Sequence, residues 1–128
     1  MSERFVLDSS AILALINNEA GAQQVEPLIS KSIVSAVNFS ETLAILERHG
    51  IKTKEGSHLL RAMIKEIIPF TAEHAFISSE IYLSCQAKGL SLGDRACLAL
   101  GISSNKPVIT ADRVWQELSL NINIRCIR

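Results

Sequence analysis

The sequence predicts an α/β protein in which a mainly parallel five-stranded sheet is flanked by helices on both faces. Two observations predict this class. Apolar, strand-like runs alternate with helical patterns along the chain, as they do in proteins built from parallel strands and crossover helices. The strand-like runs are also too continuously apolar for a sheet with one face in water, so both faces should be covered.

The chain is expected to form a single domain over residues 1–128. This length, with 48% hydrophobic and 20% charged residues, is enough to build one core, and no linker-like or repeated segment divides it. The three cysteines include no C-x-x-C pair, which argues against a disulfide framework or a zinc site and favours a reducing compartment. The net charge is zero, so any contact with nucleic acid must be local.

The amino-terminal residues differ from a secretion signal. Asp8, Ser9 and Ser10 interrupt the apolar stretch that a signal peptide requires. The apolar run over residues 11–16 is also too short to cross a bilayer. We therefore expect a cytoplasmic protein without a membrane segment.

In the first half of the chain, two apolar runs each lead almost directly into a helical pattern. Pro27 lies inside another helical pattern, where its missing N–H should kink or reposition the helix. Asn38 and Glu41 are three residues apart and have the form of a capping box. The expected elements are a strand over residues 4–8, helices over 9–16 and 22–29, a strand over 32–37 and a helix over 38–49.

The second half continues the alternation. Gly89 is the expected left-handed stop of one helix, and Ser91 with Asp94 has the form of a capping box at the start of the next. Small residues in that next helix, including Ala96 and Gly101, should let it approach a neighbouring helix or the sheet closely. The expected elements are a helix over residues 54–65, a strand over 66–70, helices over 72–88 and 91–103, and strands over 106–110 and 122–127.

Four acidic residues stand where strands lead into helices. Asp8 ends the first strand, Glu41 and Asp94 lie in first turns of helices, and Asp112 lies just beyond the fourth strand. Each has an ordinary explanation by itself, because an acid at a helix start complements the helix dipole. The carboxyl ends of parallel strands meet at one edge of a sheet, however, so these acids are expected to converge there.

Converging carboxylates predict a metal site. Carboxylates held close together repel one another unless cations neutralise them. Oxygen ligands with little histidine nearby suit Mg²⁺ or Mn²⁺ rather than Zn²⁺. Such an ion makes a bound water more acidic and neutralises a phosphate oxygen. The four acids therefore favour hydrolysis of phosphodiester bonds.

The segments that carry these acids resemble the ordered motifs of PIN-domain ribonucleases, specifically VapC-type toxins. They are VLDSS over residues 6–10, NFSE over 38–41, LSLGDRACLAL over 90–100 and VITAD over 108–112. The resemblance spans nearly the whole chain, and the long segment around Asp94 is its most specific part. It implies a PIN-like fold and a Mg²⁺- or Mn²⁺-dependent endoribonuclease. It also implies the toxin of a type II toxin–antitoxin pair, which a cognate antitoxin protein inhibits and which is usually a homodimer.

Carried over residue by residue, the resemblance assigns a role to each acid. Asp8 and Asp94 would be the principal metal-binding carboxylates, and Glu41 would bind or orient metal-bound water. Asp112 would complete the acidic cluster, and Thr110 matches the family's supporting hydroxyl residue two positions earlier. All four acids are thus expected to be both catalytic and metal-binding. No substrate-binding residue is assigned.

Two other functions stay open from the sequence alone. A non-catalytic PIN-like binding or interaction module would have the same fold, although intact acids count against it. A Mg²⁺-dependent phosphoryl-transfer domain is also α/β with an acidic pocket. Ser10 stands where an aspartyl-nucleophile phosphatase needs its second acid, however, so this function fits poorly.

Two further features point to partners. Arg95 and Arg113 each follow an acid and are candidates for contact with RNA phosphate, with pairing to a neighbouring acid or to solvent as the alternative. The first helices carry more apolar residues than one sheet face can bury, and a partner helix in a groove would use the excess. Packing in the core is the alternative for these residues, which are Ile12, Leu15, Ile16, Leu28 and Ile29.

Overall fold

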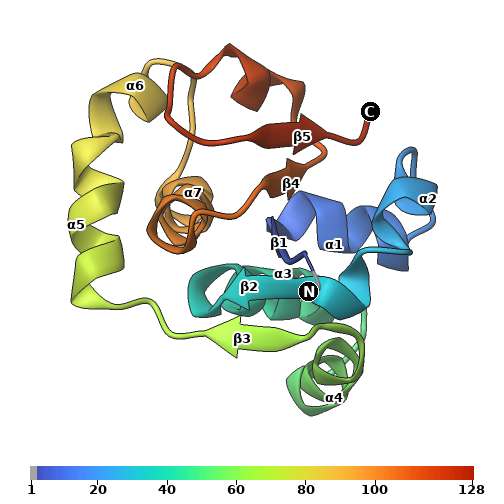
Figure 1. The fold of residues 1–128 in the computed structure, drawn as a ribbon. Coiled ribbons are helices and arrows are strands. Elements are labelled where there is room, and N and C mark those ends of the chain that lie inside the picture. Colours follow the sequence, from blue (N-terminus) through green and yellow to red (C-terminus); the bar gives the residue numbers. More distant parts are fainter. Residues whose placement is uncertain (1–2) are drawn as a thin grey trace.

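The computed structural model describes residues 3–128, so residues 1 and 2 of the predicted domain lie outside it. Its centre is a five-stranded sheet of order β3-β2-β1-β4-β5 (Figure 1). All neighbouring strands are parallel. The strands are β1 (Phe5–Leu7), β2 (Ser32–Ser35), β3 (Glu66–Ile68), β4 (Val108–Thr110) and β5 (Ile124–Cys126). The predicted α/β class with a parallel five-stranded sheet is therefore confirmed.

Helices lie on both sides of this sheet (Figure 1). Within residues 3–128, none of them is long and apolar enough to span a membrane. They are α1 (Ser9–Ile16), α2 (Ala22–Val25), α3 (Ala36–Arg48), α4 (Thr53–Met63), α5 (Ala72–Glu80), α6 (Tyr82–Gln86) and α7 (Leu92–Ser104), with two short 3₁₀ segments, η1 (Ile29–Lys31) and η2 (Arg113–Glu117).

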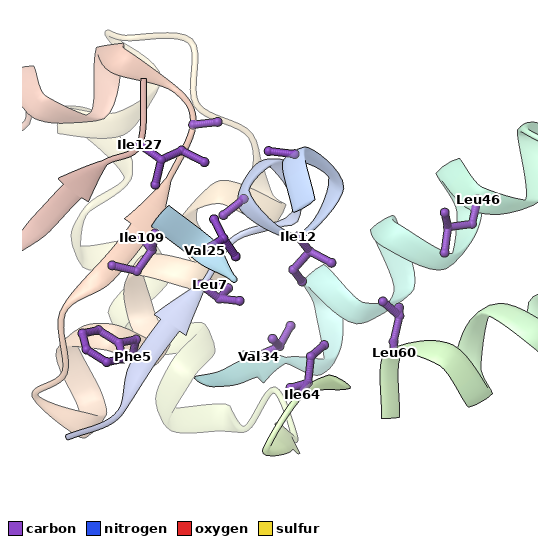
Figure 2. Close-up of a cluster of buried hydrophobic side chains, with 13 residues drawn as sticks. Phe5, Leu7, Ile12, Val25, Val34, Leu46, Leu60, Ile64, Ile109 and Ile127 are labelled. Atoms are coloured by element: carbon purple, nitrogen blue, oxygen red, sulfur yellow. The ribbon is translucent and has the colours of Figure 1, made fainter. Parts of the chain in front are cut away.

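Each face of the sheet has its own hydrophobic core, because successive strand residues point to opposite faces. Leu7 and Val34 belong to the core that α1 to α4 cover (Figure 2). Val6 and Ile33, their neighbours in sequence, belong to the core that α6, α7 and η2 cover. The strands are buried on both sides, as their continuous apolar runs predict.

The second strand ends earlier than the sequence predicted. β2 stops at Ser35, whose hydroxyl caps α3 by accepting a hydrogen bond from the backbone N of Val37 (3.2 Å). The predicted strand over residues 32–37 is therefore too long, and the predicted capping box of Asn38 and Glu41 is wrong. Asn38 lies in the first turn of α3 and Glu41 in the second. The apolar run continues through the boundary, so periodicity alone cannot locate it.

The predicted helices over residues 22–29 and 72–88 are each interrupted. Pro27 separates α2 from η1, because proline supplies no N–H to continue a helix. The second helix is divided into α5 and α6 at Ile81. Gly89 has the predicted left-handed conformation, with φ of 76°. The strands β1, β3, β4 and β5 and the helix α4 are shorter than predicted.

The small residues of α7 allow the predicted close approach. A Cβ atom at Gly101 would overlap the side chains of Val108 in β4 and Ile122. Ala96 and the residues of the helix that follow it as far as Gly101 are buried. The helix α7 therefore lies directly against the sheet, and its amino terminus, with Asp94, is brought to the carboxyl edge of the strands.

Candidate active site

The four acids predicted as site residues line one pocket at the carboxyl edge of the sheet. They come from the end of β1, from α3, from α7 and from the turn after β4. The pocket has a volume of about 250 Å³ and is lined by Asp8, Ser9, Ser10, Leu13, Glu41, Ile45, Asp94 and Asp112. The structure thus brings together acidic side chains from four distant parts of the sequence.

Asp8 is the most deeply buried acid of the pocket, with only 4% of its surface exposed. Its Oδ1 accepts hydrogen bonds from Ser10 Oγ (2.7 Å) and the backbone N of Ala11 (3.0 Å). Its Oδ2 accepts one from Thr110 Oγ1 (2.9 Å). Asp8 is also the N-cap of α1. The capping function and a place in the pocket therefore coincide in one residue.

The pKa of Asp8 is raised from 3.8 to about 6. Burial is the main cause, because it disfavours the charged carboxylate, and the nearby Asp94 raises the pKa a little further. The hydrogen bonds that Asp8 accepts lower it and offset part of the effect. A cation in the pocket would favour the ionised form and bring the pKa of Asp8 back down.

Glu41 reaches the pocket from α3 and is held on two sides. Its Oε1 accepts hydrogen bonds from Ser9 Oγ (3.0 Å) and Asn38 Nδ2 (3.0 Å). Its other oxygen, Oε2, lies against Gly93 of α7, where a Cβ atom would overlap the carboxylate. The Glu41 carboxylate therefore occupies space that any other residue at position 93 would fill.

Asp94 and Asp112 each use one carboxylate oxygen to cap a helical segment. Asp94 Oδ2 accepts a hydrogen bond from the backbone N of Ser91 (2.9 Å), and Ser91 Oγ accepts one from the backbone N of Asp94 (3.3 Å), which confirms the predicted capping box. Asp112 Oδ1 accepts one from the backbone N of Val114 (3.1 Å). Among residues 3–128, the second oxygen of each carboxylate has no hydrogen-bond donor.

Two hydroxyl groups tie the loops of the pocket together. Thr110 Oγ1 donates to Asp8 and accepts a hydrogen bond from the backbone N of Asp112 (3.0 Å). Ser10 Oγ donates to Asp8 and accepts one from the backbone N of Ala111 (2.9 Å). The turn after β1 and the turn after β4 are therefore held in a fixed relation around Asp8.

Several residues that contact the acids were not assigned to the site from the sequence. The spacing of Asn38 and Glu41, about one helical turn, was a usable signal, because such residues are neighbours on a helix surface. Hydroxyl residues directly after an acid were another. No local signal marks the glycine, because its partner belongs to a different helix. These residues are Ser9, Ser10, Asn38 and Gly93.

Neither arginine that follows an acid lines the pocket. Arg95 Nη1 donates to the carbonyl O of Ser78 (3.1 Å), and its guanidinium lies over the ring of Tyr82, 5.0 Å from the ring centre. Arg95 therefore packs against α5 and α6 and is directed away from the acids. Arg113 is exposed at the start of η2.

The donor atoms of the pocket fit a hard divalent cation. Its polar side chains are carboxylates and hydroxyls, and oxygen ligands suit Mg²⁺ or Mn²⁺. A divalent cation would also compensate the charge of the buried Asp8. In the described part of the chain, no three His, Cys, Asp or Glu side chains are already gathered as ligands of one ion. Carboxylates repel one another across a pocket, and Mg²⁺ needs only one or two of them because it keeps several waters.

The fold resembles those of solved toxin structures. VapBC2 from Rickettsia felis, bound to a promoter DNA fragment, has a TM-score of 0.73 and 16% identity, over 94% of this chain and 96% of that one. VapC20 from Mycobacterium tuberculosis, a sarcin–ricin loop cleaving toxin, has a TM-score of 0.68 and 17% identity, over 90% and 94%. A toxin–antitoxin complex from Klebsiella pneumoniae has a TM-score of 0.64 and 19% identity, over 87% of both chains.

The sequence itself matches a family model. No curated protein matches the chain significantly. The model of the PIN domain, however, matches residues 5–120, a range that includes all four acids of the pocket and most of the sheet. The PIN-like fold expected from the sequence motifs is confirmed by this match and by the structural resemblance. The chain therefore belongs to the PIN domain family.

Proposed function

We propose that this protein is a Mg²⁺- or Mn²⁺-dependent endoribonuclease that acts as the toxin of a type II toxin–antitoxin pair. The observation that carries the proposal is the convergence of four carboxylates from four chain segments on one pocket. RNA is the proposed substrate class because the chain is a PIN domain and shares its fold with VapC20, which cleaves the sarcin–ricin loop.

In phosphodiester hydrolysis, some residues of the pocket would bind the metal ion and others would orient the water or the metal ligands. Asp8 and Asp94 would hold the metal ion, which when bound supplies charge neutralisation at a phosphate oxygen and a more acidic water. Glu41 Oε2 has no hydrogen-bond donor in residues 3–128, and this oxygen would bind and orient the metal-bound water or accept its proton. Asp112 would complete the negative charge of the pocket, and Thr110 would hold Asp8 in place.

Apolar residues on the helical side formed by α1 to α4 support the proposal of an antitoxin partner. Leu15, Ile16, Leu28 and Ile29 pack against the core on that side but are only partly buried, whereas Ile12 is fully buried. Partly exposed apolar side chains at the end of α1 and at the start of η1 suit an apolar segment of a partner protein. The fold shared with a toxin–antitoxin complex agrees with such a partner.

A homodimer is the proposed oligomeric state. Phe76 and Leu83, one on α5 and one on α6, have 68% and 76% of their surface exposed. They lie on either side of the break at Ile81, seven residues apart. Large exposed apolar side chains of this kind favour burial against another chain.

The test is cleavage of total cellular RNA by purified protein free of antitoxin. Wild type is incubated with Mg²⁺ or Mn²⁺, with and without EDTA, beside Asp94→Asn and the exposed-site control Glu55→Gln. Asparagine keeps an oxygen for capping α7, so Asp94→Asn should fold. We expect metal-dependent cleavage in wild type and in Glu55→Gln, and loss of at least about a hundredfold in Asp94→Asn, since Asp94 would hold a metal ion that stabilises the transition state by several kcal/mol.

Two outcomes would contradict the proposal. Cleavage that Asp94→Asn retains would come from a contaminating nuclease or from a different site. Wild type that neither cleaves RNA nor binds a divalent cation in calorimetry would be the non-catalytic binding module.

A further inference from the structure

Asn38 is a buried polar side chain between two helices of the pocket. Only 1% of its surface is exposed. Its Nδ2 donates one hydrogen bond to Glu41 Oε1 (3.0 Å) and one to the carbonyl O of Gly93 in α7 (3.0 Å). An amide NH₂ group has two protons, so one group satisfies both acceptors. The side chain therefore connects the Glu41 carboxylate to α7.

These two partners determine which residue type can stand at position 38. A carboxylate oxygen and a backbone carbonyl are both acceptors only, so the amide must present its NH₂ group to them. The reversed amide would bring its oxygen against both acceptors, which fixes the orientation of the side chain. A short side chain with two donor protons is needed here. A hydroxyl has one, and an apolar side chain has none.

Ser9 cannot replace this function. Its hydroxyl lies within hydrogen-bond distance of both Glu41 Oε1 (3.0 Å) and the carbonyl O of Asn38 (3.2 Å). A hydroxyl has a single proton, so Ser9 donates to one of these oxygens at a time. Asn38 is thus the donor to Glu41 that does not depend on the rotation of Ser9.

The second oxygen of the Glu41 carboxylate contacts α7. Its Oε2 lies against Gly93, the residue whose carbonyl accepts the second hydrogen bond of Asn38. The carboxylate is therefore held between its donor and the helix that carries Asp94.

We propose that Asn38 is a positioning residue, which fixes the Glu41 carboxylate against α7 and thereby sets the affinity of the pocket for its divalent cation. The cation part of this inference rests on the proposed function, while the fixing of Glu41 does not. Groups that orient metal-associated residues typically change metal affinity or activity by about 10- to 100-fold when they are removed.

The test compares Asn38→Leu with wild type, because leucine has a similar shape and neither charge nor donor. Calorimetry of the metal-free proteins with Mn²⁺ should show about 10- to 100-fold weaker binding in Asn38→Leu. Asn38→Thr, which keeps one donor, should lie between the two. The carboxyl ¹³C signal of Glu41 in metal-free protein should move toward the value of an exposed, averaged glutamate in Asn38→Leu.

The matched control is Thr42→Val, on the same helix one turn further on. Thr42 is buried, its Oγ1 donates to the carbonyl O of Asn38 (2.8 Å), and its side chain forms no hydrogen bond with Glu41 within residues 3–128. This variant should lose stability, measured by urea unfolding, while its Mn²⁺ affinity stays within about twofold of wild type. The contrary outcome is that the two variants are equally stable and weaken Mn²⁺ binding equally. The loss of affinity would then come from the lower stability of the fold and not from the position of Glu41, and the proposal would be overturned.

Failure of this inference differs from failure of the proposed function. An unchanged Glu41 signal and unchanged Mn²⁺ affinity in Asn38→Leu would overturn the positioning of Glu41 by Asn38, whether or not wild type cleaves RNA. Wild type that binds Mn²⁺ but leaves RNA intact would overturn the proposed function, while weakened binding in Asn38→Leu would still support the inference.

Discussion

The two ends of the parallel strands carry opposite charges, and we call them the carboxyl edge and the amino edge of the sheet. The pocket at the carboxyl edge contains four acids and no basic residue. A smaller pocket at the amino edge is lined by Glu3, Arg4, Ser30, Lys31 and Lys65, and its basic residues stand directly before β1, β2 and β3. The whole chain has a net charge of zero, so this separation comes from the parallel arrangement of the strands and is invisible in the composition.

The edges differ even more in how their charges are held. Asp8 is buried, accepts three hydrogen bonds and has a raised pKa. Lys31 and Lys65 are exposed, and their ammonium groups form no ion pair within the described residues. Solvation by water is therefore enough to stabilise the two ammonium groups at the amino edge. At the carboxyl edge, by contrast, the Asp8 carboxylate is removed from water. Such desolvated acids with a raised pKa are found at functional sites.

The largest expected effect is on the stability of the metal-free protein. The pKa of Asp8 is about 6 in the folded state and 3.8 without the fold. The folded state therefore binds this proton more tightly, so the free energy of unfolding falls as pH rises from about 4 to about 6 and stays low above that. At pH 7 the contribution of Asp8 is unfavourable by about 3 kcal/mol. Asp8→Asn should remove it and stabilise the protein by up to that amount.

Urea unfolding in EDTA between pH 3.5 and 7 checks this prediction. Wild type and Asp8→Asn should be nearly equally stable at the acidic end and should diverge as pH rises to about 6. Glu55→Gln, at an exposed acid, should change stability by less than about 0.5 kcal/mol. Excess Mg²⁺ should reduce the difference in the free energy of unfolding between wild type and Asp8→Asn. A cation at 100 times its Kd stabilises the folded protein by about 2.7 kcal/mol. Parallel pH profiles would show that burial of Asp8 carries no penalty.

The sequence was sufficient to find the acids but not the groups that hold them. Asp8, Asp94 and Asp112 follow or precede recognisable elements, and the topology of a parallel sheet brings such positions to one edge. Asn38 was interpreted as a cap because the apolar run conceals where β2 ends and α3 begins. Its bond to Gly93 joins residues 55 positions apart, and no periodic pattern encodes such a pairing.

The fold was predicted better than its boundaries for a similar reason. Burial on both faces follows from the composition of each strand, as for Val6 and Leu7, which belong to opposite cores. The ends of elements depend instead on single hydrogen bonds, such as the cap from Ser35. The division of the predicted helix over residues 72–88 at Ile81 has no proline or glycine to mark it.

An intermediate effect is expected from two glycines of α7 that lie toward opposite edges. A Cβ at Gly93 would overlap the carboxylate of Glu41, and one at Gly101 would overlap the side chains of Val108 and Ile122. Glu41 is long and partly exposed, so Gly93→Ala should displace it and weaken Mn²⁺ binding about tenfold or more with little loss of stability. Gly101→Ala should lower the free energy of unfolding by about 1 to 3 kcal/mol through overpacking.

Calorimetry with Mn²⁺ and urea unfolding should separate these two variants. Gly101→Ala should bind Mn²⁺ within about twofold of wild type, because the overlap lies in the core away from the acids. Alanine is favoured over glycine by about 1 kcal/mol in a helix interior, which offsets part of the loss in Gly101→Ala. Equal Mn²⁺ affinity of Gly93→Ala and wild type would mean that the position of Glu41 against α7 does not matter for the pocket.

The smallest effect is expected at the amino edge. Lys31→Gln and Lys65→Gln remove exposed charges without ion pairs in the described residues, so each should change stability by less than about 0.5 kcal/mol. RNA cleavage by these variants should show the same dependence on salt concentration as wild type, because the acids lie at the other edge. A lysine that contacts a phosphate would change the slope of log affinity against log salt by about 1. A shallower slope in either variant would place the path of the RNA across the amino edge, and these lysines would then bind substrate.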